Sequence, residues 1–276
     1  MTSSALALAD VLAAEGGGEE GGFQAPSIAE FYPPAIFEFS VLGIDFEITR
    51  IILIFWLATA AMLVFLVLAA RNASVVPGKL QYIGESGYSL VRDGMARDVI
   101  GPKGLPFAPF LASLFFFILF NNFMSIFPFA QISPNSKFAI PLVLAVIVWV
   151  LYNYIGIREQ GAARYFKDAA IPPGVPIGAL ILVTPIELLQ VFVIRPFTLA
   201  VRLFANMFAG HMLLVVFSLG GVYLLTAGGI FPLFGAASFL MALVMTFFEL
   251  LVIVLQAYVF TVLTATYLNG AVEPAH

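Results

Sequence analysis

The chain has 276 residues, of which 62% are hydrophobic and 10% charged, and its formal net charge is −4. This composition excludes a soluble domain and indicates a protein that crosses a membrane several times. Its apolar runs are too long and continuous for the alternating pattern of a β-barrel, so the sequence predicts an all-α polytopic membrane protein. The lack of cysteine excludes disulfides, thiol catalysis and cysteine-ligated metals.

Residues 1–49 contain no lysine or arginine but several acidic residues, and residues 15–22 are rich in glycine and glutamate. We expect an acidic N-terminal extension, disordered over residues 15–22. The missing basic segment and the acidic interruptions argue against a signal peptide.

The first predicted span covers residues 51–70, about the length that crosses a hydrocarbon core of ~30 Å. Residues 71–103 follow, with five basic side chains among scattered apolar positions. They fit an amphipathic helix on the membrane surface or an ordinary loop. The excess of lysine and arginine places this side in the cytoplasm and the acidic N-terminus outside.

Residues 107–127 and 141–157 predict a helical hairpin that turns over residues 128–136. Asn121, Asn122 and Ser125 lie within one turn near the outer end of the first arm, where we expect them to make interhelical hydrogen bonds. A second cytoplasmic loop with three basic residues follows and ends at the Pro-Pro-Gly sequence of residues 172–174.

The last two apolar stretches, residues 178–217 and 232–268, would be about 60 Å and 55 Å long as helices, far more than a bilayer requires. Either they are broken, with Pro185 and Pro196 as candidate breaks, or they lie steeply inclined. We therefore expect about five membrane-embedded helices in a single domain over residues 50–270, then a short cytoplasmic tail at 271–276.

Few ionisable residues occur in these two stretches: Glu187, Arg195, Arg202, His211 and Glu249. An arginine in mid-span costs roughly 2.5–3.5 kcal/mol, which points to a function and a partner. Its guanidinium stays protonated, so it cannot relay protons. At about 4 Å it would attract a carboxylate by ~4 kcal/mol and favour its ionised form. The alternative is an arginine that serves only packing.

Helical periodicity predicts which polar and ionisable residues of the last two helices share a face. Asn206 lies one turn after Arg202 and shares its face, whereas His211, nine residues after Arg202, lies on the opposite side. Glu249 and Gln256 are seven residues apart and share a face of the last helix. Each of three side chains also has a purely structural interpretation. His211 could be a packed core histidine, Glu249 a carboxyl group satisfied by hydroxyl groups, and Gln256 a glutamine that bridges two helices.

Three motifs resemble one family. The run RLFANMFAG at residues 202–210 resembles the signature of subunit a of the F-type ATP synthase membrane sector, residues 255–264 resemble that family's last helix, and residues 122–128 resemble its Asn-x-x-Gly/Asp-Leu-x-Pro element. The matches come in the family's order and span roughly residues 100–270. This chain has Ser125 where the family usually has glycine or aspartate.

The resemblance implies that Arg202 is the stator charge beside a rotating ring of c subunits, along which two long, steeply inclined helices curve. It pairs His211 with Glu249 as a proton relay and makes Gln256 a neighbour of Arg202. Glu187 would be a channel carboxylate, although it lies fifteen residues before Arg202 and the family's acid lies fourteen before. The resemblance leaves Arg195 between a structural role and the inner half-channel.

We therefore expect a proton-channel stator subunit of a rotary ATP synthase, with two half-channels leading to and from the ring carboxylates. Its expected partners are the c-ring, peripheral-stalk b subunits, other synthase subunits and the lipid bilayer, with no nucleic acid, cofactor or metal. The chain lacks a phosphate loop and is not expected to be catalytic alone; without a transit peptide, a bacterial plasma membrane is expected.

The alternative function is a stand-alone ion-coupled transporter or channel, which would favour internal repeats and paired broken helices. The two long stretches share no motif. An intramembrane hydrolase is weaker still, because neither a His-Glu-x-x-His nor a Gly-x-Ser-x-Gly motif is present.

Overall fold

A computed structural model describes residues 35–41, 44–71, 74–128, 130–171 and 177–272. Within these ranges five helices are long and apolar enough to cross a membrane: Arg50–Arg71, Pro102–Phe123, Ala139–Gln160, Leu180–Thr226 and Phe231–Val272. The prediction of an all-α polytopic membrane protein whose last two helices are long is confirmed. The disorder expected over residues 15–22 concerns residues outside the described ranges.

A short antiparallel hairpin precedes the first span and was not predicted. It consists of β1 (Ala35–Val41) and β2 (Ile44–Thr49), and Glu38 pairs with Glu47 across the strands. Apolar and polar residues alternate along β2 and, in β1, from Phe37 to Val41, which is the period of a strand. The interpretation of residues 1–49 as one acidic extension overlooked this signal.

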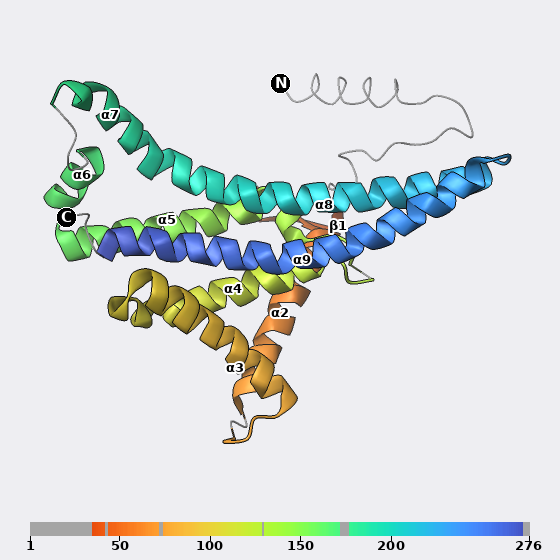
Figure 1. Cartoon of the computed structure of the whole chain (residues 1–276), viewed down its shortest axis with the longest axis horizontal. Coiled ribbons are helices and arrows are strands. Elements are labelled where there is room, and N and C mark those ends of the chain that lie inside the picture. Colours follow the sequence, from red (N-terminus) through yellow and green to blue (C-terminus); the bar gives the residue numbers. More distant parts are fainter. Residues whose placement is uncertain (1–34, 42–43, 72–73, 129, 172–176, 273–276) are drawn as a thin grey trace.

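Residues 79–100 are helical, as one of the two interpretations of the 71–103 segment predicted. α3 (Lys79–Val91) continues into the π-helical segment η2 (Arg92–Ile100), and η3 (Pro102–Phe107) leads into α4 (Ala108–Phe123). In Figure 1, α3 and α2 (Arg50–Arg71) form a V beneath the other helices. Buried Val91, Met95 and Ala96 give this helix its inner face. Its position at a membrane surface stays a prediction.

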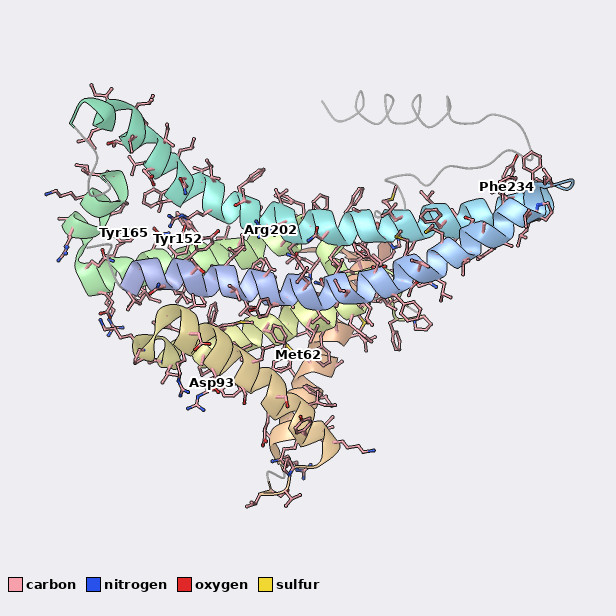
Figure 2. The ribbon with its side chains drawn as sticks, viewed as in Figure 1. Met62, Asp93, Tyr152, Tyr165, Arg202 and Phe234 are labelled. Carbon is pink, nitrogen blue, oxygen red and sulfur yellow. The ribbon has the colours of Figure 1, made fainter. Side chains whose placement is uncertain are left out.

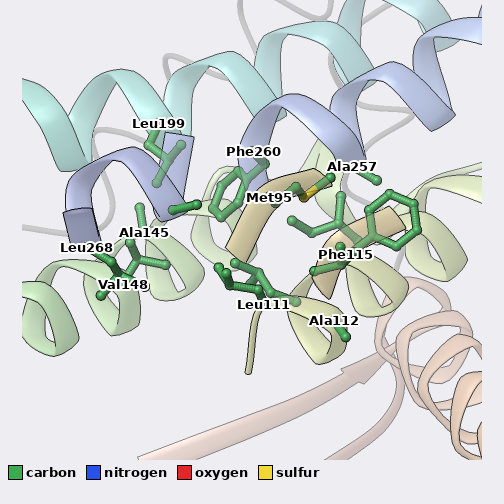
Figure 3. Close-up of a cluster of buried hydrophobic side chains, with 14 of the residues drawn as sticks. Met95, Leu111, Ala112, Phe115, Ala145, Val148, Leu199, Ala257, Phe260 and Leu268 are labelled. Carbon is green, nitrogen blue, oxygen red and sulfur yellow. The ribbon is translucent and has the colours of Figure 1, made fainter. Parts of the chain in front are cut away.

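The core is built around the last helix, α9 (Phe231–Val272). It runs beside α8 (Arg195–Thr226), and α4 and α5 (Ala139–Gln160) lie along the same direction (Figure 1). Figure 3 shows α9 side chains interdigitating with those of α4, α5, α8 and η2; the labelled members are Met95, Leu111, Ala112, Phe115, Ala145, Val148, Leu199, Ala257, Phe260 and Leu268. Small residues such as Ala257 let neighbouring helices approach closely.

The two long helices are unbroken. The first comprises α7 (Ile177–Leu189), the π-helical segment η5 (Gln190–Ile194) and α8; Pro185 lies inside α7, and Pro196 is the second residue of α8. The chain bends between α7 and α8 without leaving the helix (Figure 1). The 42 residues of α9 are about 63 Å long, so a helix lying wholly within a ~30 Å core would be tilted by about 60°. This inclination stays a proposal.

α8 continues to Thr226, beyond the predicted end at residue 217. Gly221 does not end the helix, because it lies against α9. A Cβ atom on Gly235 of α9 would lie 3.0 Å from the carbonyl oxygen of Gly221 and 2.9 Å from the backbone nitrogen of Leu225. The two backbones therefore meet directly at this end of the helix pair.

Candidate functional site

Arg202 lies in the third turn of α8, near the middle of the continuous helix Leu180–Thr226, and is exposed (Figure 2). Leu199, Leu203 and Met207 form the buried stripe of the same helix, so the arginine points away from the protein core. Within the described ranges no ion pair or hydrogen bond to its guanidinium is found. An exposed, unpaired cation halfway along an apolar helix is suited to meet a negative charge from another chain.

Asn206 shares this exposed face, as predicted, and connects it to α9. Its Nδ2 donates a hydrogen bond to Oε1 of Gln256, with 2.5 Å between the two atoms. Gln256 is only 3% exposed, and its buried Nε2 has no partner among the described residues. The glutamine therefore reaches the arginine face through Asn206, one helical turn from Arg202.

Glu249 is buried on α9 and lies against the α8 backbone. It is 3% exposed, and neither carboxyl oxygen accepts a hydrogen bond from a described residue. A Cβ atom on Gly210 would lie 3.5 Å from its Cδ. The Ser125 hydroxyl faces this carboxyl group but donates to the carbonyl oxygen of Asn122 at 2.8 Å.

Glu249 shares a cavity of about 270 Å³ with Asn206, Gly210 and Gln256. Most of the cavity lining is apolar, and Asn206 and Gln256 are the polar side chains that share it with Glu249. A buried carboxyl group without protein donors in such a cavity is suited to gain and lose a proton.

His211 is buried on the side of α8 opposite Arg202, as predicted. It lines a second cavity of about 560 Å³ together with Ser125, Gln131, Ser218 and Thr246. The neighbouring residue Gly210 borders the cavity of Glu249. Consecutive residues of α8 thus line the two cavities, and His211 and Glu249 each belong to one of them.

Asn121, Asn122 and Ser125 were expected to make interhelical hydrogen bonds. Among the described residues, the side chains of Asn121 and Ser125 donate to the nearby carbonyl oxygens of Phe117 and Asn122, and Asn122 bonds to the turn after α4. Asn135 Nδ2 donates to Asn122 Oδ1 at 2.7 Å, and Ser133 Oγ donates to the carbonyl oxygen of Asn121 at 3.2 Å. The turn folds back over the end of α4, so its side chains reach the asparagines first. These bonds fix the wall that carries Ser125.

A family model described as ATP synthase A chain matches residues 52–269. The chain belongs to this family. It is 45% identical to the ATP synthase subunit a of Parafrankia sp. (strain EAN1pec) over 91% of this chain and 85% of that protein. The subunit a of Frankia alni is 43% identical over 91% and 86%, and that of Rhodococcus erythropolis 41% identical over 91% of each chain. The family predicted from the motifs is confirmed.

The one-residue departure of Glu187 from the family spacing coincides with a π-helical turn. The segment η5 lies between Glu187 and Arg202, and a π turn bonds to the fifth residue and not the fourth, so it holds one residue more than an α turn. The fifteen residues from Glu187 to Arg202 then rotate about the helix axis as far as fourteen α-helical residues would. This rotation is about 40° short of four full turns. Glu187 and Arg202 therefore keep nearly the same face. Glu187 is half-buried and borders neither cavity described above.

Arg195 lies at a third cavity, on the part of the α8–α9 contact nearer the C-terminus. Its guanidinium carbon is 5.6 Å from the ring centre of Tyr267 on α9. With Gln190, Thr198 and Thr266 it lines a space of about 450 Å³. Arg195 thus has both a packing partner and access to a polar cavity.

Sequence reasoning missed Gln131, Ser218 and Thr246, which line the cavity of His211. Ser218 lies seven residues after His211 and Thr246 three before Glu249, so each shares a helical face with a predicted site residue. That periodicity could have identified both.

Proposed function

We infer that this chain is the proton-conducting stator subunit of a rotary F-type ATP synthase, coupling proton flow through two half-channels to ring rotation and ATP synthesis. Family membership supports this function over a stand-alone transporter or channel. The observation that carries the mechanism is the exposed Arg202, unpaired among the described residues, one turn from an asparagine bonded to a buried polar site.

Protons enter through the cavity of His211 and pass to Glu249, whose cavity leads to Gln256 and Asn206. Imidazole and carboxyl groups both gain and lose protons near neutral pH, so each suits a relay. The proton then binds an ionised carboxylate on a c subunit. The neutral acid can face lipid at low cost, and the ring turns.

Arg202 acts at the other end of the cycle. Its fixed charge attracts the returning carboxylate and favours its ionised form, so the proton leaves into the inner half-channel. The same charge repels a proton that would pass between the half-channels without using the ring. The membrane potential, ~2.3 kcal/mol per charge per 100 mV, is thereby coupled to rotation.

The remaining assignments follow from this function. The c-ring lies against the face of α8 that carries Arg202, and the b subunits and the other synthase subunits complete the complex. Glu187 contributes to the proton route on the inner side. The chain is a subunit without catalysis of its own, resident in a bacterial plasma membrane with its N-terminus outside and its C-terminus in the cytoplasm.

The test is ATP-driven proton pumping in inverted vesicles whose synthase carries Arg202→Ala, with ATP hydrolysis and passive proton permeability measured in the same preparation. We expect pumping to be lost while the complex stays assembled. Arg97→Ala, which removes a surface arginine paired with Asp93 at 3.0 Å, is the control and should pump normally. Wild-type pumping by Arg202→Ala would overturn the stator-charge mechanism.

A further inference from the structure

The π-helical segment η5 and the proline that follows it leave the Val191 carbonyl without a donor from its own helix. The N–H of Arg195 donates to the carbonyl oxygen of Gln190, five residues earlier. The next donor in this pattern would be the nitrogen of residue 196, bonding the carbonyl of Val191. Residue 196 is proline, which has no N–H. The Val191 carbonyl, on a residue only 7% exposed, therefore needs a donor from elsewhere.

Tyr152 of α5 supplies that donor. Its hydroxyl donates to the Val191 carbonyl oxygen at 2.6 Å, and Tyr152 is itself 2% exposed. Figure 2 shows Tyr152 lying between α5 and the α7–α8 region. Its ring contacts that of Tyr267 on α9, with centroids 5.8 Å apart, so packing fixes the hydroxyl in place. The bond joins α5 to the π turn across 39 residues of sequence.

The π turn decides which residues face the third cavity. Gln190 and Ile194, its first and last residues, line that cavity with Arg195, whereas Val193 is exposed outside it. Converting the π turn to an α turn would rotate α7 by about 100° relative to α8. α7 would move and α8 would stay, because α8 holds the buried stripe and α7 has no fully buried residue among those described.

We propose that Tyr152 is a positioning residue that holds the π turn and thereby directs Gln190 into a water-accessible exit cavity between α8 and α9, which Arg195 of α8 also lines. The proposal rests on the proposed function, since it assigns this cavity to the inner half-channel. It deepens that function by naming a side chain that touches neither proton nor ring and yet sets the geometry of proton release.

The experiment uses thiol labelling in the assembled synthase, because the chain has no cysteine of its own. Gln190→Cys and Val193→Cys are made separately and treated in inverted vesicles with a water-soluble maleimide. Only a hydrated thiol ionises and reacts readily. The ratio of the two labelling rates, position 190 over position 193, therefore reports which face of the π turn meets water.

Tyr152→Phe removes only the hydroxyl. We expect it to lower the labelling ratio by about fivefold, the shift that one unsatisfied buried carbonyl produces, and to slow ATP-driven pumping. Tyr165→Phe is the matched control, since its hydroxyl bonds Asn153 Oδ1 at 2.9 Å and not the π turn; the ratio should stay unchanged.

An unchanged ratio in Tyr152→Phe overturns the proposal. So does an equal fall in Tyr165→Phe, which would indicate general loosening of this region. Labelling does not depend on turnover, whereas the Arg202→Ala pumping test does. Failure of the proposed function and failure of this proposal therefore give different results.

Discussion

The contact between Gly210 and Glu249 makes the proposed proton site sensitive to the addition of single carbon atoms. A Cβ at residue 210 would lie 3.5 Å from Cδ, 3.6 Å from Oε1 and 3.7 Å from Cγ of Glu249, all ordinary van der Waals distances. Gly210→Ala therefore fits without displacing the carboxyl group. Gly210→Val adds two further methyl groups on this side and fills part of the cavity of about 270 Å³.

The expected magnitudes follow from packing. Overpacking a closed site costs typically about 1–3 kcal/mol, which corresponds to roughly fivefold to more than a hundredfold in an equilibrium or a rate. Gly210→Val should slow ATP-driven pumping by a factor in that range, because the Glu249 carboxyl must leave its position beside Asn206 and Gln256. Gly210→Ala should stay within about twofold of wild type, since its new contact is not a clash.

The assay is ATP-driven acidification of inverted vesicles, normalised to the amount of assembled complex. Gly178→Val is the control, because a Cβ at that α7 position has nothing within 4 Å. Wild-type pumping by Gly210→Val would refute the reasoning. Equal impairment by Gly210→Val and Gly178→Val would refute it too, since the effect would then not depend on Glu249.

Three further results are expected. Asn206→Ala and Gln256→Ala should each slow pumping, and a double-mutant cycle should give a coupling of about 1 kcal/mol from their shared hydrogen bond; additive effects would contradict this. Burial raises the pKa of Tyr165 above its ordinary value of 10.0, more than nearby Arg195 lowers it, so its stabilising contribution is complete below pH 10 and lost as the pH rises further. Thermal unfolding of the purified complex between pH 8 and 11 should show this loss, and Tyr165→Phe should reduce it; an identical pH profile would contradict the assignment. Gly235→Val should lower thermal stability by about 1–3 kcal/mol through the close contact with Gly221 and Leu225, and an unchanged melting temperature would contradict it.

Helical periodicity predicted much of the candidate site. The spacing of four residues placed Arg202 and Asn206 on one face, and the spacing of nine placed His211 on the other; both placements agree with their exposure in the structure. Glu249 and Gln256, seven residues apart, border the same cavity. These relations depend only on the geometry of a continuous helix, so sequence suffices for them. The roles of these residues in proton transfer stay predictions.

Features that depend on contacts between distant segments could not be predicted in the same way. The π turn at residues 190–194 accepts a hydrogen bond from Tyr152, which lies on another helix. No local sequence pattern predicts that hydrogen bond. The continuation of α8 past Gly221 depends likewise on α9, whose Gly235 meets it. A glycine that ends a helix and one that admits a neighbouring backbone look the same in sequence.

In the proposed function, the arrangement of α8 and α9 restricts where a proton can reach the ring. Glu249 and Gln256 are buried between the helices, whereas Arg202 is exposed on the outer face of α8. Asn206 belongs to both environments, since it is exposed and yet bonded to Gln256. Proton transfer from the buried site should therefore occur at the level of Asn206, one helical turn or about 5.4 Å along the axis from Arg202. We therefore expect a ring carboxylate to be protonated close to Arg202, on one side of it. The carboxylate would then release its proton only when it reaches Arg202 from the other side, after nearly a full rotation of the ring.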